Sequence, residues 1–226
     1  YVIKEYEEET NLTCHVILDI SESMRYGSGR LTKLDYAGLT AASLAYLLLK
    51  QKDSVGFHYF DRDVRRSFNP SNRMSYLRDM LTYLAEEVEP VEKTAVGPVF
   101  HRIAEEVNRR GMFIILSDLF VNVDDLMSGL KHFRFKRHEV LVLHVLDEAE
   151  VTFPFQQQTL FKGLEATGEL LANPKSLRKA YLRIVSDFIK RMKGECAANS
   201  IDYLQLTTSD SLEVVLAHFL AQRANR

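Results

Sequence analysis

The chain has 226 residues, of which 46% are hydrophobic and 27% charged, a balance typical of soluble globular proteins rather than disordered or fibrous ones. Lys and Arg number 29 against 31 Asp and Glu, and the formal charge of -2 argues against nucleic acid or an anionic membrane as a partner. No apolar stretch approaches the roughly 18 residues that a membrane-spanning helix needs, so we expect no membrane contact by this segment.

The cysteines and the first residues of the chain give information on the cellular location of the protein. Cys14 and Cys196 form neither a CxxC pair nor a disulfide framework, so we interpret them as core residues of a protein in a reducing compartment. The sequence begins at Tyr1 rather than at methionine, which predicts the C-terminal part of a longer protein. We expect a cytoplasmic domain, although upstream residues could associate the full-length protein with a membrane. No feature of the sequence indicates an oligomeric state.

The first part of the chain alternates between strand and helix patterns. An apolar run at 12–19 predicts a strand, and Leu and Ala residues at helical spacing predict a helix over 31–51. A second strand at 54–60 reaches a charged corner and returns through 64–68, which predicts a hairpin at one edge of a sheet. A helical stretch at 73–86 follows.

The same alternation continues in the middle of the chain. Apolar residues at helical spacing predict a helix over 96–108. The almost wholly apolar run at 112–118 is typical of a central parallel strand with both faces covered. A short helix at 123–132 and a strand at 138–146 complete the pattern.

An insertion interrupts the alternation near its end. Residues 150–173 contain alternating residues and glycines, which predict a β excursion. Asn173 is then a favourable N-cap, with Pro174 as the first residue of a long amphipathic helix. A last strand at 202–206 and a terminal helix at 210–223 follow.

These elements predict one α/β domain over residues 1–226. It would be a three-layer arrangement, a doubly wound, mostly parallel sheet with helices on both faces and right-handed crossovers. Ligands of such sheets bind at the carboxyl ends of the strands, where the strand order reverses. Residues that follow the strands are therefore the first candidates for a functional site.

Oxygen-bearing side chains gather at two of these strand ends. The first strand ends at Asp19, Ser21 and Ser23 follow at alternate positions, and a later strand ends at Asp118. If the two strands are neighbours, both carboxylates enter one crevice and repel each other unless a cation or hydrogen-bond donors intervene. Thr94, at the entry to a helix, would add a third hydroxyl.

The donor types indicate which metal would bind. Carboxylates, hydroxyls and water suit a hard cation, so we expect Mg²⁺, with Mn²⁺ or Ca²⁺ as substitutes, and not zinc. Each residue also has a simpler explanation, because Asp19 and the serines could form a turn while Thr94 and Asp118 could cap helices. Five such groups in this order favour the metal site. The histidines lack metal-binding spacing, so we expect His58 and His144 to be core or surface residues.

The segments "DISESM", "EKTAVG" and "LSDLF" resemble the metal ion-dependent adhesion site of von Willebrand factor A domains. The resemblance implies that the direct ligands are Ser21, Ser23 and Thr94. It implies that Asp19 and Asp118 act directly or through water, and that an acidic residue of a partner protein completes the coordination. It also implies a six-stranded sheet whose hairpin strand runs antiparallel at one edge.

Much of the chain is similar to a narrower group, the bacterial family known as domain of unknown function 58, often encoded beside MoxR-type AAA+ ATPases. The similarity runs from Tyr1 to about Ala221 and is carried by "YVIKEYEEETNLTCHVILDISESM", "TKLDYA", "AASLAYLLLKQKDSVGF" and "ILSDLF". The upstream segment usual in the family would precede Tyr1. Leu119, where many A domains have glycine, and Glu22, between the serines, depart from the general pattern without removing a ligand.

Together the residues and the resemblance predict a non-enzymatic, metal-dependent module that captures a Glu or Asp of a partner protein. The resemblance implies a MoxR-type AAA+ ATPase system with chaperone-like function. A Mg²⁺-dependent phosphohydrolase with Asp19 as nucleophile or Asp118 as base is an alternative. It is disfavoured because Ser21 stands where a second acid would follow, and the loop has no Lys or His to act as general acid. A structural interaction domain with a vestigial site is the third alternative.

Overall fold

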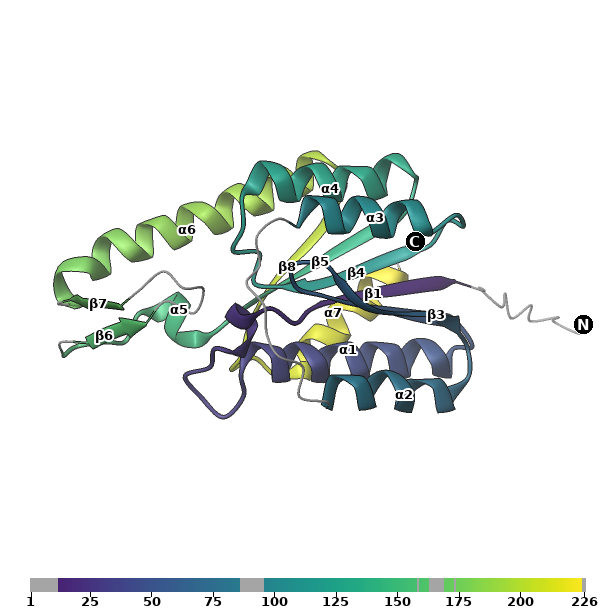
Figure 1. Cartoon of the computed structure of the whole chain (residues 1–226), viewed down its shortest axis with the longest axis horizontal. Helices are drawn as coiled ribbons and strands as arrows, with labels where there is room; N and C mark the ends of the chain where they lie inside the picture. The colour runs from purple at the N-terminus through teal and green to yellow at the C-terminus, as the bar shows by residue number, and fades with distance from the viewer. Residues whose placement is uncertain (1–11, 86–95, 158, 163–168, 173, 225–226) are drawn as a thin grey trace, which may run out of the picture.

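The computed structural model describes residues 12–85, 96–157, 159–162, 169–172 and 174–224 (Figure 1). Its main sheet has six strands in the order β3-β2-β1-β4-β5-β8, and β6 pairs with β7 in a separate two-stranded sheet. Neighbours in the main sheet run parallel except for β2 and β3, which run antiparallel. The predicted α/β fold, with a mostly parallel six-stranded sheet and one antiparallel edge strand, is confirmed.

The elements have the following bounds. The strands are β1 (Thr13–Asp19), β2 (Ser54–Phe60), β3 (Val64–Ser71), β4 (Met112–Ser117), β5 (Glu139–Leu146), β6 (Thr159–Lys162), β7 (Glu169–Ala172) and β8 (Asp202–Thr207). The helices are the 3₁₀ helix η1 (Glu22–Arg25) and α1 (Lys33–Lys50), α2 (Met74–Ala85), α3 (Gly97–Glu106), α4 (Val123–Phe135), α5 (Glu148–Thr152), α6 (Pro174–Ala198) and α7 (Leu212–Ala224).

Helices cover both faces of the main sheet, which gives three layers (Figure 1). One hydrophobic cluster joins the sheet to α1, α2 and α7, and a second joins it to α3, α4 and α6. Neighbouring residues of β1 pack into different clusters: Leu18 belongs to the first and Ile17 to the second. Since successive side chains of a strand point to opposite faces, a strand buried on both faces must be apolar throughout.

Polar side chains fix where several helices begin. Thr32 and Asp35 form a reciprocal capping box at the start of α1. Asn122 precedes α4, and its side chain accepts hydrogen bonds from the backbone N–H groups of Asp124 and Asp125. Each cap satisfies helix N–H groups that have no partner inside the helix.

The structure departs from the predicted elements at a few places. The helix predicted at 123–132 continues to Phe135, and its added turn buries Phe133 in the core. The predicted insertion contains the strands β6 and β7, but the short helix α5 before them was not predicted. Pro174 is the first residue of α6, as predicted, whereas Asn173 lies outside the described residues.

The cysteines lie where the sequence predicted them. Cys14 and Cys196 are fully buried and belong to the two hydrophobic clusters, which confirms that they are core residues. Within the described ranges, no helix has both the length and the apolar character that crossing a membrane requires.

Candidate metal centre

The strand order brings the two predicted acids to one rim of the sheet. The chain passes from β1 to β2 on one side, whereas β4 and β5 lie on the other, so the order reverses between β1 and β4. Leu18 of β1 pairs with Leu116 of β4, which places Asp19 one residue and Asp118 two residues beyond this pair. Both carboxylates therefore lie where ligands of doubly wound sheets bind.

Asp19 is fully buried, and hydrogen-bond donors hold its carboxylate. Oδ1 accepts from the backbone N–H of Ser21 at 3.0 Å and from its hydroxyl at 2.6 Å. Oδ2 accepts from the hydroxyl of Ser117 at 2.5 Å. Burying a carboxylate is costly unless donors or a cation compensate for the lost water. The three donors therefore orient Asp19 and lower the cost of burying it.

The two serines of the loop extend this set of oxygen atoms. Ser21 is fully buried and Ser23, within η1, is 8% exposed, and their hydroxyl oxygens lie 3.3 Å apart. A hydroxyl that donates its hydrogen to Asp19 keeps its lone pairs for a cation. The loop thus presents one carboxylate and two hydroxyls as neighbouring hard oxygen donors.

Asp118 is fully buried, and the backbone after it has a left-handed conformation. Its Oδ1 accepts from the backbone N–H of Phe120 at 3.2 Å. Leu119 between them has a φ of 56°, which costs about 1 kcal/mol or more for a residue other than glycine. The glycine that many A domains have here would adopt this conformation without strain. Leu119 is 1% exposed and packs in the core, which offsets the cost.

Lys33, the first residue of α1, pairs with Asp118 inside the protein. Its side chain is 1% exposed, and its Nζ lies 3.0 Å from Asp118 Oδ2 and 2.7 Å from Glu150 Oε1. Burial alone would lower the pKa of Lys33, but the two carboxylates outweigh it and raise the pKa above its usual value. Lys33 is therefore a fixed positive charge that links Asp118 to α5.

His144 of β5 orients the backbone of Asp118. The fully buried imidazole lies with Nε2 2.9 Å from the carbonyl oxygen of Asp118, and with Nδ1 2.6 Å from the hydroxyl of Tyr203 on β8. A carbonyl only accepts, so Nε2 carries the proton and Nδ1 accepts from Tyr203. His144 is buried in the core, in line with the prediction of a core or surface residue.

Asp147, at the end of β5, ties three segments of the rim together. Its Oδ1 accepts from the hydroxyl of Ser28 at 2.5 Å and from the backbone N–H of Ala149, which caps α5. Its Oδ2 accepts from the backbone N–H of Ser28 and from the hydroxyl of Thr208. One buried carboxylate therefore fastens the loop after η1 to both α5 and the end of β8.

The charges and donor types of this crevice fit a hard divalent cation. Asp19, Asp118 and Glu150 carry three negative charges and Lys33 one positive charge, so the ionised set has a net charge of -2. In the described part of the chain, no three His, Cys, Asp or Glu side chains gather as a metal-binding group. The donor set is instead rich in hydroxyls, which suits Mg²⁺ better than zinc.

Four of the five predicted ligands can be placed. Asp19, Ser21 and Ser23 lie together on the first loop, and Asp118 lies at the end of the neighbouring strand. Thr94, the fifth, is outside the described residues.

Several residues around these ligands were missed. Lys33 and Ser117 touch the acids directly, but the prediction considered only the first loop, the strand ends and Thr94. The one available signal for Lys33 was its position between Leu31 and Leu34 at the start of a helix.

Comparisons with known proteins place the chain in a family and identify related folds. The family described as "Protein of unknown function DUF58" matches residues 1–191. No curated protein shows significant similarity.

Among solved structures, the conserved hypothetical protein BatB from Bacteroides thetaiotaomicron is 16% identical, with a TM-score of 0.64 over 95% of this chain and 100% of that one. An aerotolerance-related membrane protein from Bacteroides fragilis is also 16% identical, with a TM-score of 0.63 over 92% and 97%. The pilus adhesin SpaC from Lactobacillus rhamnosus GG is 12% identical, with a TM-score of 0.54 over 95% of this chain and 30% of the adhesin. At these identities the likeness shows the fold.

Proposed function

The chain belongs to the family described as Protein of unknown function DUF58, and we propose that it is a protein-binding module that works through a metal ion-dependent adhesion site. An Mg²⁺ ion in the crevice would leave a coordination position for the carboxylate of a Glu or Asp on another protein. The proposed ligands are Asp19, Ser21, Ser23, Thr94 and Asp118. Mn²⁺ or Ca²⁺ could replace Mg²⁺, because both bind the same oxygen donors.

The observation that carries the proposal is the continuous set of oxygen donors at the ends of β1 and β4. Ser117, Asp19, Ser21 and Ser23 are joined by hydrogen bonds of 2.5, 2.6 and 3.3 Å, and Asp118 follows Ser117 directly. A purely structural turn has no need for two fully buried carboxylates on adjacent strands, because each burial is costly. A divalent cation would compensate for both.

The residues around the ligands would prepare the crevice for the ion. Ser117 holds one oxygen of Asp19 in place. His144 fixes the peptide plane that follows Asp118. Such supporting contacts orient ligands before a metal binds and raise the affinity of the site.

The proposed partner system is a MoxR-type AAA+ ATPase, and it rests on the resemblance to a family often encoded beside such ATPases. In that system the chain would act as an adaptor or as an arm of a chaperone-like assembly. The similar pilus protein SpaC is described as an adhesin, which supports a protein-binding role for this fold.

No observation favours the phosphohydrolase alternative. A nucleophilic Asp19 would have to reach a substrate, but it is fully buried and three hydrogen-bond donors hold both of its oxygens. Lys33 is near Asp118, yet its ammonium is already paired with two carboxylates. The vestigial-site alternative predicts that divalent cations leave the protein unchanged, and this can be measured.

Metal binding is tested by following thermal unfolding while Mg²⁺ or Mn²⁺ is added to chelator-treated protein. We expect the melting temperature of the wild type to rise with cation concentration, since a ligand that binds only the folded state stabilises it. Asp19→Ala should remove the response. Asp124→Ala changes an exposed aspartate on α4 and should keep it.

Partner capture is tested by a pull-down with a purified MoxR-type ATPase, in Mg²⁺ and in EDTA. We expect retention by the wild type in Mg²⁺ only, and none by Asp19→Ala. Equal retention under all conditions would disprove the adhesion mechanism and leave the fold unaffected.

A further inference from the structure

The two edges of the main sheet differ in how they are protected. The edge strand β3 pairs irregularly with β2, carries Arg65 and Arg66, and contains Pro70. Bulges, charges and proline are the usual means by which proteins prevent an edge strand from pairing with another chain. The opposite edge strand, β8, has the sequence DYLQLT, without proline and with Asp202 as its one charged residue.

Backbone groups of β8 face outward along this second edge. The N–H of Thr208 bonds to the carbonyl of Leu146 on β5, and alternate residues of a strand direct their N–H groups to opposite sides. The N–H of Thr207 accordingly points outward, where the Asp210 carboxylate accepts it at 2.7 Å. By the same alternation the N–H groups of Tyr203 and Gln205 point outward.

A groove runs along these outward groups, between β8 and α6. It consists of two continuous hollows that share Lys193 and Tyr203. The first, of about 560 Å³, lies at the start of β5 and β8. The second, of about 580 Å³, lies beside the outward groups. Tyr203 packs with the cluster on the α6 side, and Leu204 packs with the cluster on the other face, yet both line the second hollow. A hollow that touches residues from both faces of a strand opens on its edge.

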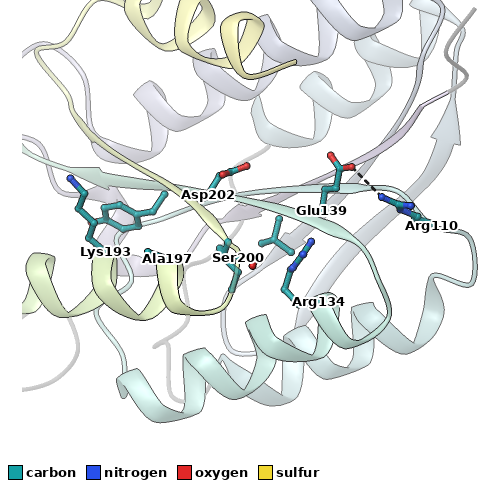
Figure 2. A pocket seen from close by; sticks show the side chains of 10 residues that line it. Arg110, Arg134, Glu139, Lys193, Ala197, Ser200 and Asp202 are labelled. Atoms are coloured by element: carbon teal, nitrogen blue, oxygen red, sulfur yellow. Dashed lines mark ion pairs between the residues drawn. The ribbon is translucent and has the colours of Figure 1, made fainter. Parts of the chain in front are cut away.

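The walls of the groove are apolar and basic. Along α6 the second hollow has the apolar residues Leu182, Val185 and Ile189 beside the exposed Lys190 and Lys193. At the other end, Figure 2 shows Lys193 and Ala197 on one side of the first hollow and Arg110, paired with Glu139, on the other.

Counted over both hollows, the basic lining residues outnumber the acidic ones. They are Arg110, Arg134, Lys190 and Lys193 against Glu139 and Asp202. The excess lies beside β8, where Lys190 and Lys193 have no carboxylate opposite them in the second hollow.

We propose that the β8 edge is a second protein-binding site, which takes an extended, acidic segment of another protein by strand addition. The segment would pair with the outward N–H groups of Tyr203 and Gln205. On the face of the segment that looks toward α6, apolar side chains would enter the groove and carboxylates would pair with Lys190 and Lys193 of the same helix. In this mode of recognition, main-chain hydrogen bonds give affinity and alternate side chains give specificity.

The probe is a synthetic peptide as long as β8 in which valine and glutamate take turns at every second position, with threonine between them, so that both types face α6. Its control has lysine in place of glutamate. Titration into isotope-labelled protein is followed by nuclear magnetic resonance, which detects weak binding and assigns it to residues. We expect shifts centred on Tyr203, Gln205 and Lys190, at least tenfold weaker binding of the lysine peptide, and weaker binding at higher salt. Equal binding of both peptides, or shifts elsewhere, would overturn the proposal.

Two variants make the test specific. Gln205→Pro removes one outward N–H from an edge strand, where proline is tolerated, whereas Gln205→Ala keeps it. We expect the proline variant to bind at least tenfold more weakly than the alanine variant. Lys190→Glu combined with Lys193→Glu changes only exposed side chains and should weaken binding of the glutamate peptide by a similar factor even if Gln205→Pro fails to fold. Unchanged affinity in the double variant would refute the charge argument.

The site is distinct from the metal centre, and the test separates them. Peptide binding should persist in EDTA and in Asp19→Ala, so that loss of the adhesion mechanism leaves this proposal standing. Sedimentation measures the other occupant of the edge, a second copy of the chain. A dimer that Gln205→Pro dissociates would assign β8 to self-association and overturn the proposed partner.

Discussion

Replacing Lys33 by methionine would test the electrostatics of the proposed metal centre most directly. The side chain is 1% exposed and pairs at 3.0 Å with Asp118 and at 2.7 Å with Glu150. Methionine keeps much of the length and apolar contact of lysine but removes the charge that pairs with the buried Asp118 and the partly buried Glu150. Removing one partner of a buried ion pair costs about 3–5 kcal/mol.

We therefore expect Lys33→Met to lower the free energy of unfolding in EDTA by about 3–5 kcal/mol, measured by urea denaturation. A divalent ion should restore much of this loss, because the ammonium no longer repels it from Asp118. We expect the apparent dissociation constant for Mg²⁺ to fall by at least about tenfold, which corresponds to about 1.4 kcal/mol. Calorimetric titration measures that constant directly.

The matched control is Lys50→Met, at the exposed end of the same helix, which should change stability by less than about 0.5 kcal/mol. The reasoning fails if Lys33→Met is as stable as the control in EDTA. It also fails if Mg²⁺ stabilises Lys33→Met no more than the wild type, because Lys33 would then have no electrostatic contact with the ion.

Three further predictions concern the core. In Gly129→Ala the new Cβ would lie 2.7 Å from Cβ of Phe100, so we expect the free energy of unfolding, measured in urea, to fall by about 1–3 kcal/mol. Gly194→Ala, with open space around the new Cβ, should raise it by about 0.5–1 kcal/mol. Similar values for the two variants would contradict close packing of α3 on α4. Tyr203→Phe removes the hydroxyl that lies 2.6 Å from His144 Nδ1 and should cost about 1–3 kcal/mol by the same assay, against little change for the exposed Tyr46→Phe. Burial lowers the pKa of His15 to about 3 and of His58 to about 4, from 6.5. The unfolded chain therefore binds more protons than the folded chain between pH 6.5 and about 4. As the pH is lowered through this range, the free energy of unfolding should decrease by about 1.4 kcal/mol per pH unit for each histidine. His58→Gln should reduce this slope, and an unchanged slope would show that His58 does not contribute.

Most of the fold could be predicted because its signals are local. A strand such as β4, buried on both faces, is apolar along most of its length, and the sequence shows this run from Met112 to Leu116 directly. The start of α6 at Pro174 was also readable, since proline suits the first turn of a helix. The helix α5 was missed because five residues give no periodicity, although its capping box of Asp147 and Glu150 was present in the sequence.

In the candidate site, contacts between residues close in sequence could likewise be predicted, whereas contacts between distant residues could not. Asp19, Ser21 and Ser23 are close in sequence, so their proximity follows from one loop. Placing Asp118 beside them required only that β1 and β4 be neighbours, which the rule for doubly wound sheets supplies. Lys33 and Glu150 are 117 residues apart and meet only after α1 and α5 have packed against the rim. No local pattern predicts such a contact, and a lysine at a helix start is ordinarily solvated.

The four hydrogen bonds that Asp147 accepts from Ser28, Ala149 and Thr208 bear on how fast a partner can associate. All four bonds join groups of the protein itself, so the loop after η1 would meet the proposed partner in the shape that it already has. Association that requires no rearrangement proceeds at about 10⁵–10⁷ M⁻¹ s⁻¹, in a single kinetic phase. Differences in affinity between partners should then appear as differences in residence time.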